Sequence, residues 1–347
     1  MSFKKFLKRL AGLTSIALVV VALFNFLPTI KVVSLLPILT KSEPVNSLSG
    51  RTGGDGPILV VKIDDTPAAH PQAGLEDADV VYIEQVEGGL TRLAAVFSSK
   101  IPAVVGPVRS ARISDIEILQ QYGRVAFAYS GAQAKLLPVI DAANLENLGA
   151  QHQPREIYAN DPARIAPTAM MLQAQKLLAK VIASNSPIAI SKSVGWNFGV
   201  APDTGTSISS VKVSWPANSY DATWSISQER WLLSHQGVAD LSAAGLQLGP
   251  TTFVIQLVSI TPSEYHDKVG GVTPFSATVG SGKGYVLRDG VSIAANWNRA
   301  TGDQGTSWTD LSGAEINFAP GQVWIALTDK EPIFTPKFAD APTPATK

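Results

Sequence analysis

The 347-residue chain contains no cysteine at all, and this absence removes several classes of chemistry. Disulfide bonds, thiolate zinc sites, a cysteine nucleophile and lipid attachment to an N-terminal cysteine are all excluded. An excess of one charge sign is also lacking, because 28 basic residues balance 28 acidic ones. Four of the basic residues lie within the first nine positions, so the rest of the chain is slightly acidic. A nucleic-acid partner is therefore not expected, since a phosphate backbone is normally met by a basic face.

Histidine is scarce as well, with four residues at positions 70, 152, 235 and 266. None of them belongs to a His-Glu-x-x-His motif or to another paired spacing that is typical of a zinc site. The sequence therefore predicts no metal site and no cofactor.

A long apolar run lies near the N-terminus. Residues 10–27 carry no charge and are about as long as a helix needs to be to cross a bilayer. The basic residues in segment 1–9 predict a cytoplasmic N-terminus, with everything after the run on the extracytoplasmic side of the plasma membrane. The alternative is a cleaved signal peptide, but the bulky residues at the end of the run form no small-x-small cleavage pattern. We therefore expect a retained, single-pass signal anchor.

The first part of the remaining chain changes composition near residue 57. Residues 28–56 are rich in proline, glycine and small polar residues and predict a flexible linker. Residues 57–186 combine apolar runs typical of buried strands with stretches of helical spacing, and they predict a mixed α/β domain. The stretch from Pro162 to Ser184 is expected to form one long helix within it.

The second part has a different pattern. Residues 187–330 hold all seven tryptophans and many short alternating runs separated by Gly, Pro, Asp and Asn. This pattern predicts an antiparallel all-β domain, folded as a sandwich or barrel, with most tryptophans in its core. Residues 331–347 are proline-rich and are expected to be a disordered tail. The fold class is thus α+β, with an N-terminal transmembrane helix.

The strongest chemical signal is a pair of arginines in the segment VVGPVRSAR, residues 104–112. A guanidinium is permanently charged, so Arg109 and Arg112 each need a carboxylate, an anionic ligand or water. Ser130 and Gly131 follow another apolar run and precede a predicted helix, an arrangement that can direct backbone N–H groups at an anion. The candidate ligand-binding residues are Asp64, Asp65, Arg92, Arg109, Ser110, Arg112, Ser130 and Gly131.

Two glutamates near these arginines leave the role of the cluster open. Glu84 interrupts an apolar run, and a carboxylate in such a place needs a partner. One interpretation is a structural network of ion pairs, and another is a cleft in which arginines bind an acidic ligand. A third is catalysis, with Glu84 and Glu87 as acid and base in glycoside cleavage, although the carboxyl separation that this reaction depends on cannot be read from sequence.

Several long motifs occur in a fixed order. The first part contains PVNSLSG, the continuous segment from Ile58 to Phe97, and GPVRSAR. The second part contains WNFG, YDATWSISQERW, VGSGKGYVLRDG, ANWNR and APGQVWIAL. Together they resemble the YerB-like bacterial envelope proteins, a family of lipoproteins and anchored proteins with an N- and a C-terminal domain and no established function. The resemblance implies an extracytoplasmic location and a two-domain division, and it implies no catalytic residue. The lipobox cysteine of the lipoprotein members is missing here, which agrees with an anchor helix.

These observations predict a membrane-anchored, extracytoplasmic binding or scaffold protein of the cell envelope that is not an enzyme. Its partner would be an anionic envelope component or another envelope protein. The alternative is a hydrolase that acts on the cell wall through a carboxylate acid and base.

Overall fold

The computed structural model describes residues 43–337. The expected cytoplasmic segment, the signal anchor and residues 28–42 of the expected linker lie outside this range, as do residues 338–347 of the expected tail. Among the described residues, no helix combines the length and the apolar character that crossing a membrane requires.

Strands dominate the described part of the chain, and helices are few. The α-helices there are α2 (Ile113–Gln120), α3 (Leu137–Ala142) and α4 (Ala174–Ala183), and the 3-10 helices are η1 (Pro67–Ala69), η2 (Leu75–Asp77), η3 (Glu87–Gly89) and η4 (Ala150–His152). The strands of the first half are β1 (Leu59–Asp64), β2 (Val80–Gln85), β3 (Thr91–Phe97), β4 (Val125–Ala128), β5 (Leu145–Asn147), β6 (Tyr158–Asn160) and β7 (Met170–Leu172). Those of the second half are β8 (Thr206–Trp215), β9 (Asn218–Ser225), β10 (Arg230–His235), β11 (Val238–Ala239), β12 (Thr252–Leu257), β13 (Ile260–His266), β14 (Val272–Ser276), β15 (Gly280–Arg288), β16 (Val291–Arg299), β17 (Ser307–Asp310), β18 (Val323–Thr328) and β19 (Ile333–Pro336).

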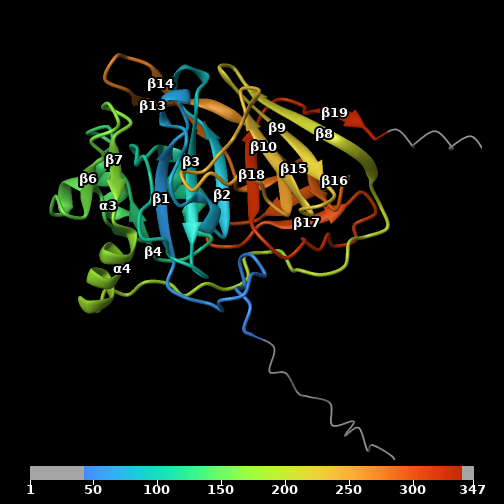
Figure 1. The fold of residues 1–347 in the computed structure, drawn as a ribbon, viewed down its shortest axis with the longest axis horizontal. Coiled ribbons are helices and arrows are strands. Elements are labelled where there is room, and N and C mark those ends of the chain that lie inside the picture. Colours follow the sequence, from blue (N-terminus) through green and yellow to red (C-terminus); the bar gives the residue numbers. More distant parts are fainter. Residues whose placement is uncertain (1–42, 338–347) are drawn as a thin grey trace, which may run out of the picture. The chain divides into compact units, whose positions relative to one another are not determined.

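One mixed sheet runs through both halves of the chain. Its strand order is β11-β10-β9-β8-β16-β15-β12-β18-β2-β3-β1-β4-β5, with β17 beside β16 and β19 beside β8. Strand β18, from the end of the chain, pairs in parallel with β12 on one side and with β2 on the other. Figure 1 shows β18 beside β2. The sequence predicts purely antiparallel pairing in the second half, and this prediction is wrong for β18. That strand is parallel to β12 and to β2, because it joins the sheet of the second half to the strands of the first.

The expected strands of the first half form where their apolar runs lie. Because side chains alternate across a strand, β1 directs Leu59, Val61 and Ile63 into one core and Val60 into the other. A strand that is buried on both faces reads as a continuous apolar run, which explains the sequence pattern. Six of the seven tryptophans are buried, as expected; Trp224 is only partly buried and packs against the core.

The expected long helix between Pro162 and Ser184 is wrong in its first half. Residues 170–172 form β7, which pairs with β6 in an antiparallel ribbon, and α4 begins only at Ala174. Backbone hydrogen bonds between Val105 and Leu172 hold β7 against the segment that leads to the arginines. This tertiary pairing overrides the local helical preference.

Candidate functional site

The arginine segment lies between the diverging ends of two parallel strands. Strands β1 and β4 pair only over Leu59–Val61, and beyond that point residues 107–111 run between them. The Arg109 N–H donates to the Lys62 carbonyl at 2.8 Å, and the Ser130 N–H donates to the Arg109 carbonyl at 3.0 Å. The arginine side chains are thus carried by a segment that is fixed on both sides by the sheet.

Arg112 forms a buried ion pair with Glu87. Its Nη2 and Nε donate to Glu87 Oε2 at 2.6 and 2.9 Å, and the hydroxyl of Thr273 donates to Glu87 Oε1. Burial alone raises the pKa of Glu87, but the hydrogen bonds and charge of Arg112 outweigh it and hold that pKa below its ordinary value. Thr273 lies in β14, so its hydrogen bond to Glu87 connects the two halves of the chain.

Arg109 is paired as well. Its Nε lies 2.7 Å from Oδ2 of Asp64, the last residue of β1, and the guanidinium is partly exposed. The other carboxylate oxygen of Asp64 accepts the N–H of Thr66 at 3.0 Å. Asp64 and Arg109, both expected in a candidate site, therefore lie together.

Arg92 differs from the other two arginines. No carboxylate among residues 43–337 lies within 4.0 Å of its guanidinium, whose Nη1 donates to the Ser110 carbonyl at 2.7 Å. Burial, followed by the charges of Arg112 and Arg109, lowers the pKa of Arg92 to about 9. Arg92 is thus a buried cation that lacks a partner carboxylate, and it lies beside two arginines that each have one.

A cavity of about 820 Å³ opens over these three arginines. The hairpin between β13 and β14, which carries Lys268, forms part of its wall. Four cationic side chains line the cavity, namely Arg92, Arg109, Arg112 and Lys268. Three carboxylates also line it and offset part of this charge, namely Asp64, Glu87 and Asp267. Apolar residues complete the lining, namely Val86, Leu90, Ala111, Ala132, Ala134, Leu136, Leu137, Pro167, Tyr265 and Val269.

Glu84 lies deeper in the protein and does not line the cavity. Its partner is Lys62, a lysine inside the apolar run of β1, whose Nζ also donates to Asp115 Oδ1 at 2.8 Å. Burial and the charge of Asp115 raise the pKa of Glu84 to about 7, against the opposing effect of Lys62. Sequence reasoning missed Lys62, although a lysine within a doubly buried strand is a signal for a buried carboxylate.

The two expected acid and base candidates do not form a free pair. Glu84 is enclosed with Lys62, and Glu87 is held by Arg112 and Thr273. Neither presents an unpaired carboxylate to the cavity, which glycoside cleavage would need from at least one of them.

Backbone groups make the contacts that place Ser110, Ser130 and Gly131 near the arginines. The carbonyl of Ser110 accepts from Arg92, and that of Gly131 accepts the N–H of Ala111 at 2.9 Å. The N–H of Ser130 is already bonded to Arg109, and α3 begins only at Leu137. Of these three residues, only Ser110 lines the cavity.

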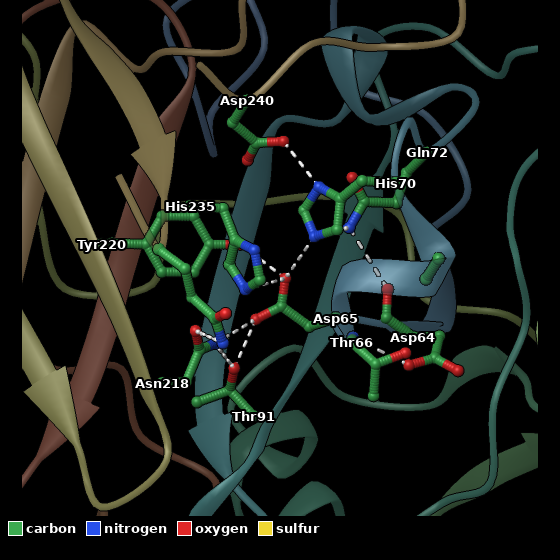
Figure 2. Close-up of polar contacts among 12 residues, drawn as sticks. Asp64, Asp65, Thr66, His70, Gln72, Thr91, Asn218, Tyr220, His235 and Asp240 are labelled. Carbon is green, nitrogen blue, oxygen red and sulfur yellow. Dashed lines mark hydrogen bonds and ion pairs between the residues drawn. The ribbon is translucent and has the colours of Figure 1, made fainter. Parts of the chain in front are cut away.

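Asp65 belongs to a second polar cluster, which Figure 2 shows. Because side chains alternate along β1, Asp65 lies on the face that carries Ile63, opposite to Asp64. Its Oδ1 accepts from the Tyr220 hydroxyl at 2.5 Å, and its Oδ2 accepts from Asn218 Nδ2 at 3.1 Å and from the Thr91 hydroxyl. The sequence had grouped Asp65 with the arginines, but Asp65 does not line the cavity.

Two histidines complete this second cluster. The rings of His70 and His235 stack with centroids 4.2 Å apart, and Asp240 Oδ1 lies 2.9 Å from His70 Nδ1. Burial alone lowers the pKa of His70, but Asp240 and Asp65 raise it to about 9, whereas burial lowers the pKa of His235. Sequence spacing gave no sign of this cluster, because the fold joins the segment after β1 to the end of β10.

The sequence matches two family models in succession. Residues 47–187 match the model described as "Protein of unknown function (DUF3048) N-terminal domain", and residues 211–325 match the corresponding C-terminal domain. The cavity draws its arginines from the first matched region and its β13–β14 wall from the second.

One curated protein and one solved structure are similar to this chain. A 56-residue segment is 50% identical to "Putative lipoprotein YerB" of Bacillus subtilis, over 16% of this chain and 17% of that protein. The crystal structure of YerB from Bacillus subtilis superposes with a TM-score of 0.71, at 19% identity, over 83% of this chain and 97% of the other. At that identity the structural match shows a shared fold.

Proposed function

Because this chain belongs to the family with DUF3048 N- and C-terminal domains, as YerB-like proteins do, we propose that it is a membrane-anchored, extracytoplasmic binding protein. Its ligand is an anionic component of the cell envelope. Two facts support the location: the uncharged run at residues 10–27 behind a basic start, and the description of the Bacillus subtilis relative as a lipoprotein. A chain without cysteine cannot carry that relative's type of lipid anchor, so the apolar run takes its place.

The observation that carries the ligand proposal is Arg92. A buried guanidinium without a carboxylate partner is unfavourable unless an anion neutralises it. The cationic side chains around the cavity outnumber the carboxylates by one, so one further anionic group would balance the charge of the lining. Phosphate and carboxylate both match the planar donors of arginine.

The size and lining of the cavity define the rest of the ligand. About 820 Å³ is the size of a small-molecule site rather than of a protein interface. Apolar side chains such as Leu90, Leu136 and Val269 surround the charged groups. The ligand therefore carries its phosphate or carboxylate group on a body with apolar surface, or it is the end of an anionic polymer.

Retention on purified cell wall tests this function. The full-length chain in detergent is mixed with cell wall of Bacillus subtilis, and bound protein is measured for the parent, Arg92→Gln and Lys100→Gln. Lys100 is an exposed cation outside the cavity and serves as the matched control. We expect inorganic phosphate to compete for the parent, and we expect Arg92→Gln to lose at least tenfold in retention while Lys100→Gln keeps it.

Two results would contradict the proposal. The first is a parent that the wall does not retain. The second is a parent whose retention Lys100→Gln reduces as much as Arg92→Gln does, because binding would then follow net charge rather than the cavity.

A further inference from the structure

Three potential metal ligands converge on the side of the sheet opposite the arginine cavity. Asp65 Oδ1 lies 3.5 Å from His70 Nε2 and 3.9 Å from His235 Nε2, and one ligand atom from each residue lies within 4.8 Å of the others. Figure 2 shows both imidazoles turned toward this carboxylate. We propose that Asp65, His70 and His235 form a binding site for a zinc ion.

The spacing of the ligand atoms suits zinc. Zinc binds histidine nitrogen and carboxylate oxygen at about 2.0–2.2 Å in a tetrahedral arrangement, which places its ligand atoms about 3.3 Å apart. The distances from Asp65 to His70 and to His235, 3.5 and 3.9 Å, exceed this value by about 0.2 and about 0.6 Å, differences that side-chain rotations can close. Two imidazoles and one carboxylate leave a fourth position for water.

His235 supplies an independent observation. Its side chain is 6% exposed, and its Nε2 has no hydrogen-bond partner among residues 43–337. A buried polar atom without a partner is costly, and this one points at Asp65 Oδ1. A metal ion bound between the two would satisfy it.

Carboxylate, hydroxyl and amide groups already orient these ligands. Asp240 Oδ1 lies 2.9 Å from His70 Nδ1, so a proton on Nδ1 leaves the lone pair on Nε2 for a metal. Histidine ligands of metals almost always have such a carboxylate or carbonyl partner. Thr91 and Asn218 donate to Asp65 Oδ2, which leaves Oδ1 directed toward the two rings.

The remaining contacts are compatible with a bound ion. The Tyr220 hydroxyl donates to Asp65 Oδ1, which has a second lone pair available for a metal. Gln72 Nε2 lies 3.3 Å from His70 Nε2 but also donates to the Asp64 carbonyl at 3.2 Å, so it can keep that bond when His70 turns to an ion. The His70 side chain is 16% exposed and provides a route from solvent.

Charge supports the same conclusion. Asp65 and Asp240 are both buried carboxylates within one cluster, and a divalent cation can take the place of the proton on His70 and balance both charges while both imidazoles bind it as neutral ligands. The ion would join the segment after β1 to the end of β10, and so would fix the first half of the chain to the second.

Metal titration of the full-length chain tests the site. The protein is treated with a chelator, dialysed and titrated with Zn²⁺ by calorimetry, and Co²⁺ is added separately as a visible-absorption probe. We expect one Zn²⁺ per chain with sub-micromolar affinity and a Co²⁺ spectrum typical of nitrogen and oxygen ligands. His235→Gln should abolish binding, and Asp240→Asn should weaken it about 10- to 100-fold.

The matched control is His152→Gln, since His152 is exposed and lies outside the cluster. It should bind Zn²⁺ as the parent does. If His235→Gln fails to fold, judged by its far-UV circular dichroism, Asp240→Asn and the parent spectrum decide the question. A parent that binds no Zn²⁺, that binds it only weakly at several sites, or that loses it in His152→Gln but not in Asp240→Asn overturns the proposal.

Discussion

Asp64 and Asp65 are consecutive residues whose carboxylates belong to two different sites. Asp64 Oδ2 lies 2.7 Å from Arg109 Nε at the cavity, whereas Asp65 Oδ1 accepts from the Tyr220 hydroxyl at 2.5 Å on the other side of the sheet. The alternation of side chains at the end of β1 produces this division. A single strand end therefore supplies both the arginine cavity and the histidine cluster.

The pair of Arg112 and Glu87 should be important for stability. Removing one partner of a buried ion pair leaves the other charge uncompensated, so Arg112→Ala should lower the free energy of unfolding by about 3 kcal/mol or more. Arg124→Ala is the matched control, because Arg124 pairs with Glu146 near the surface and should cost less than about 1 kcal/mol. Urea denaturation measures the free energy of unfolding of both variants. Equal losses would show that the buried pair of Arg112 and Glu87 does not stabilise the fold more than a surface pair does.

Glu84 should make stability depend on pH. Its pKa is raised from 4.5 to about 7 by burial and Asp115, so the folded protein holds more protons than the unfolded chain between these values. The contribution of Glu84 to the free energy of unfolding therefore falls as pH rises from about 4.5 to about 7, by up to about 1.4 kcal/mol per pH unit. Glu84→Gln keeps an acceptor for Lys62 and should remove this fall.

Glu146→Gln is the control for the pH experiment, because Glu146 lies in the more exposed pair with Arg124. It should show the same fall in stability as the parent when unfolding is followed by urea denaturation at several pH values. A Glu84→Gln variant that still shows the parent's full dependence would contradict the assignment to Glu84.

The glycines after Glu87 allow the contact between η3 and the second half of the chain to be tested. Both have positive φ, +67° at Gly88 and +73° at Gly89, so alanine at either is strained by about 1–2 kcal/mol. A Cβ at Gly88 meets open space, whereas one at Gly89 would lie 2.4 Å from Pro216 Cβ. Gly89→Ala should therefore lower the melting temperature clearly more than Gly88→Ala, and equal effects would contradict this close approach.

Much of the first half could be predicted from sequence, because its signals are local. The apolar runs of this half do form buried strands, such as β3, and the arginines after Val108 do lie together with Asp64 and Glu87. Apolar runs and interrupted runs depend on neighbouring residues, which a single sequence displays.

The rest depends on contacts between residues far apart in the chain. Nothing near His70 indicates that His235 will stack on it. The continuous apolar run of β18 is typical of a strand buried on both faces, but nothing in it identifies β2 as its parallel neighbour. Lys62 was visible in the sequence, but only its burial opposite Glu84 identifies it as a partner. Similarly, the arginines could be read as a group, whereas the lack of a carboxylate partner at Arg92 follows only from three-dimensional distances.

The most direct test of the anionic-ligand site is thermal unfolding of Arg92→Gln and of the parent, each with inorganic phosphate or with chloride at equal ionic strength. In the proposed function, Arg92 is kept charged and desolvated for an anionic ligand rather than for the fold. We therefore expect Arg92→Gln to melt in chloride at the same temperature as the parent or higher, and we expect phosphate to stabilise only the parent. A variant that melts several degrees lower and still responds to phosphate as the parent does would contradict it.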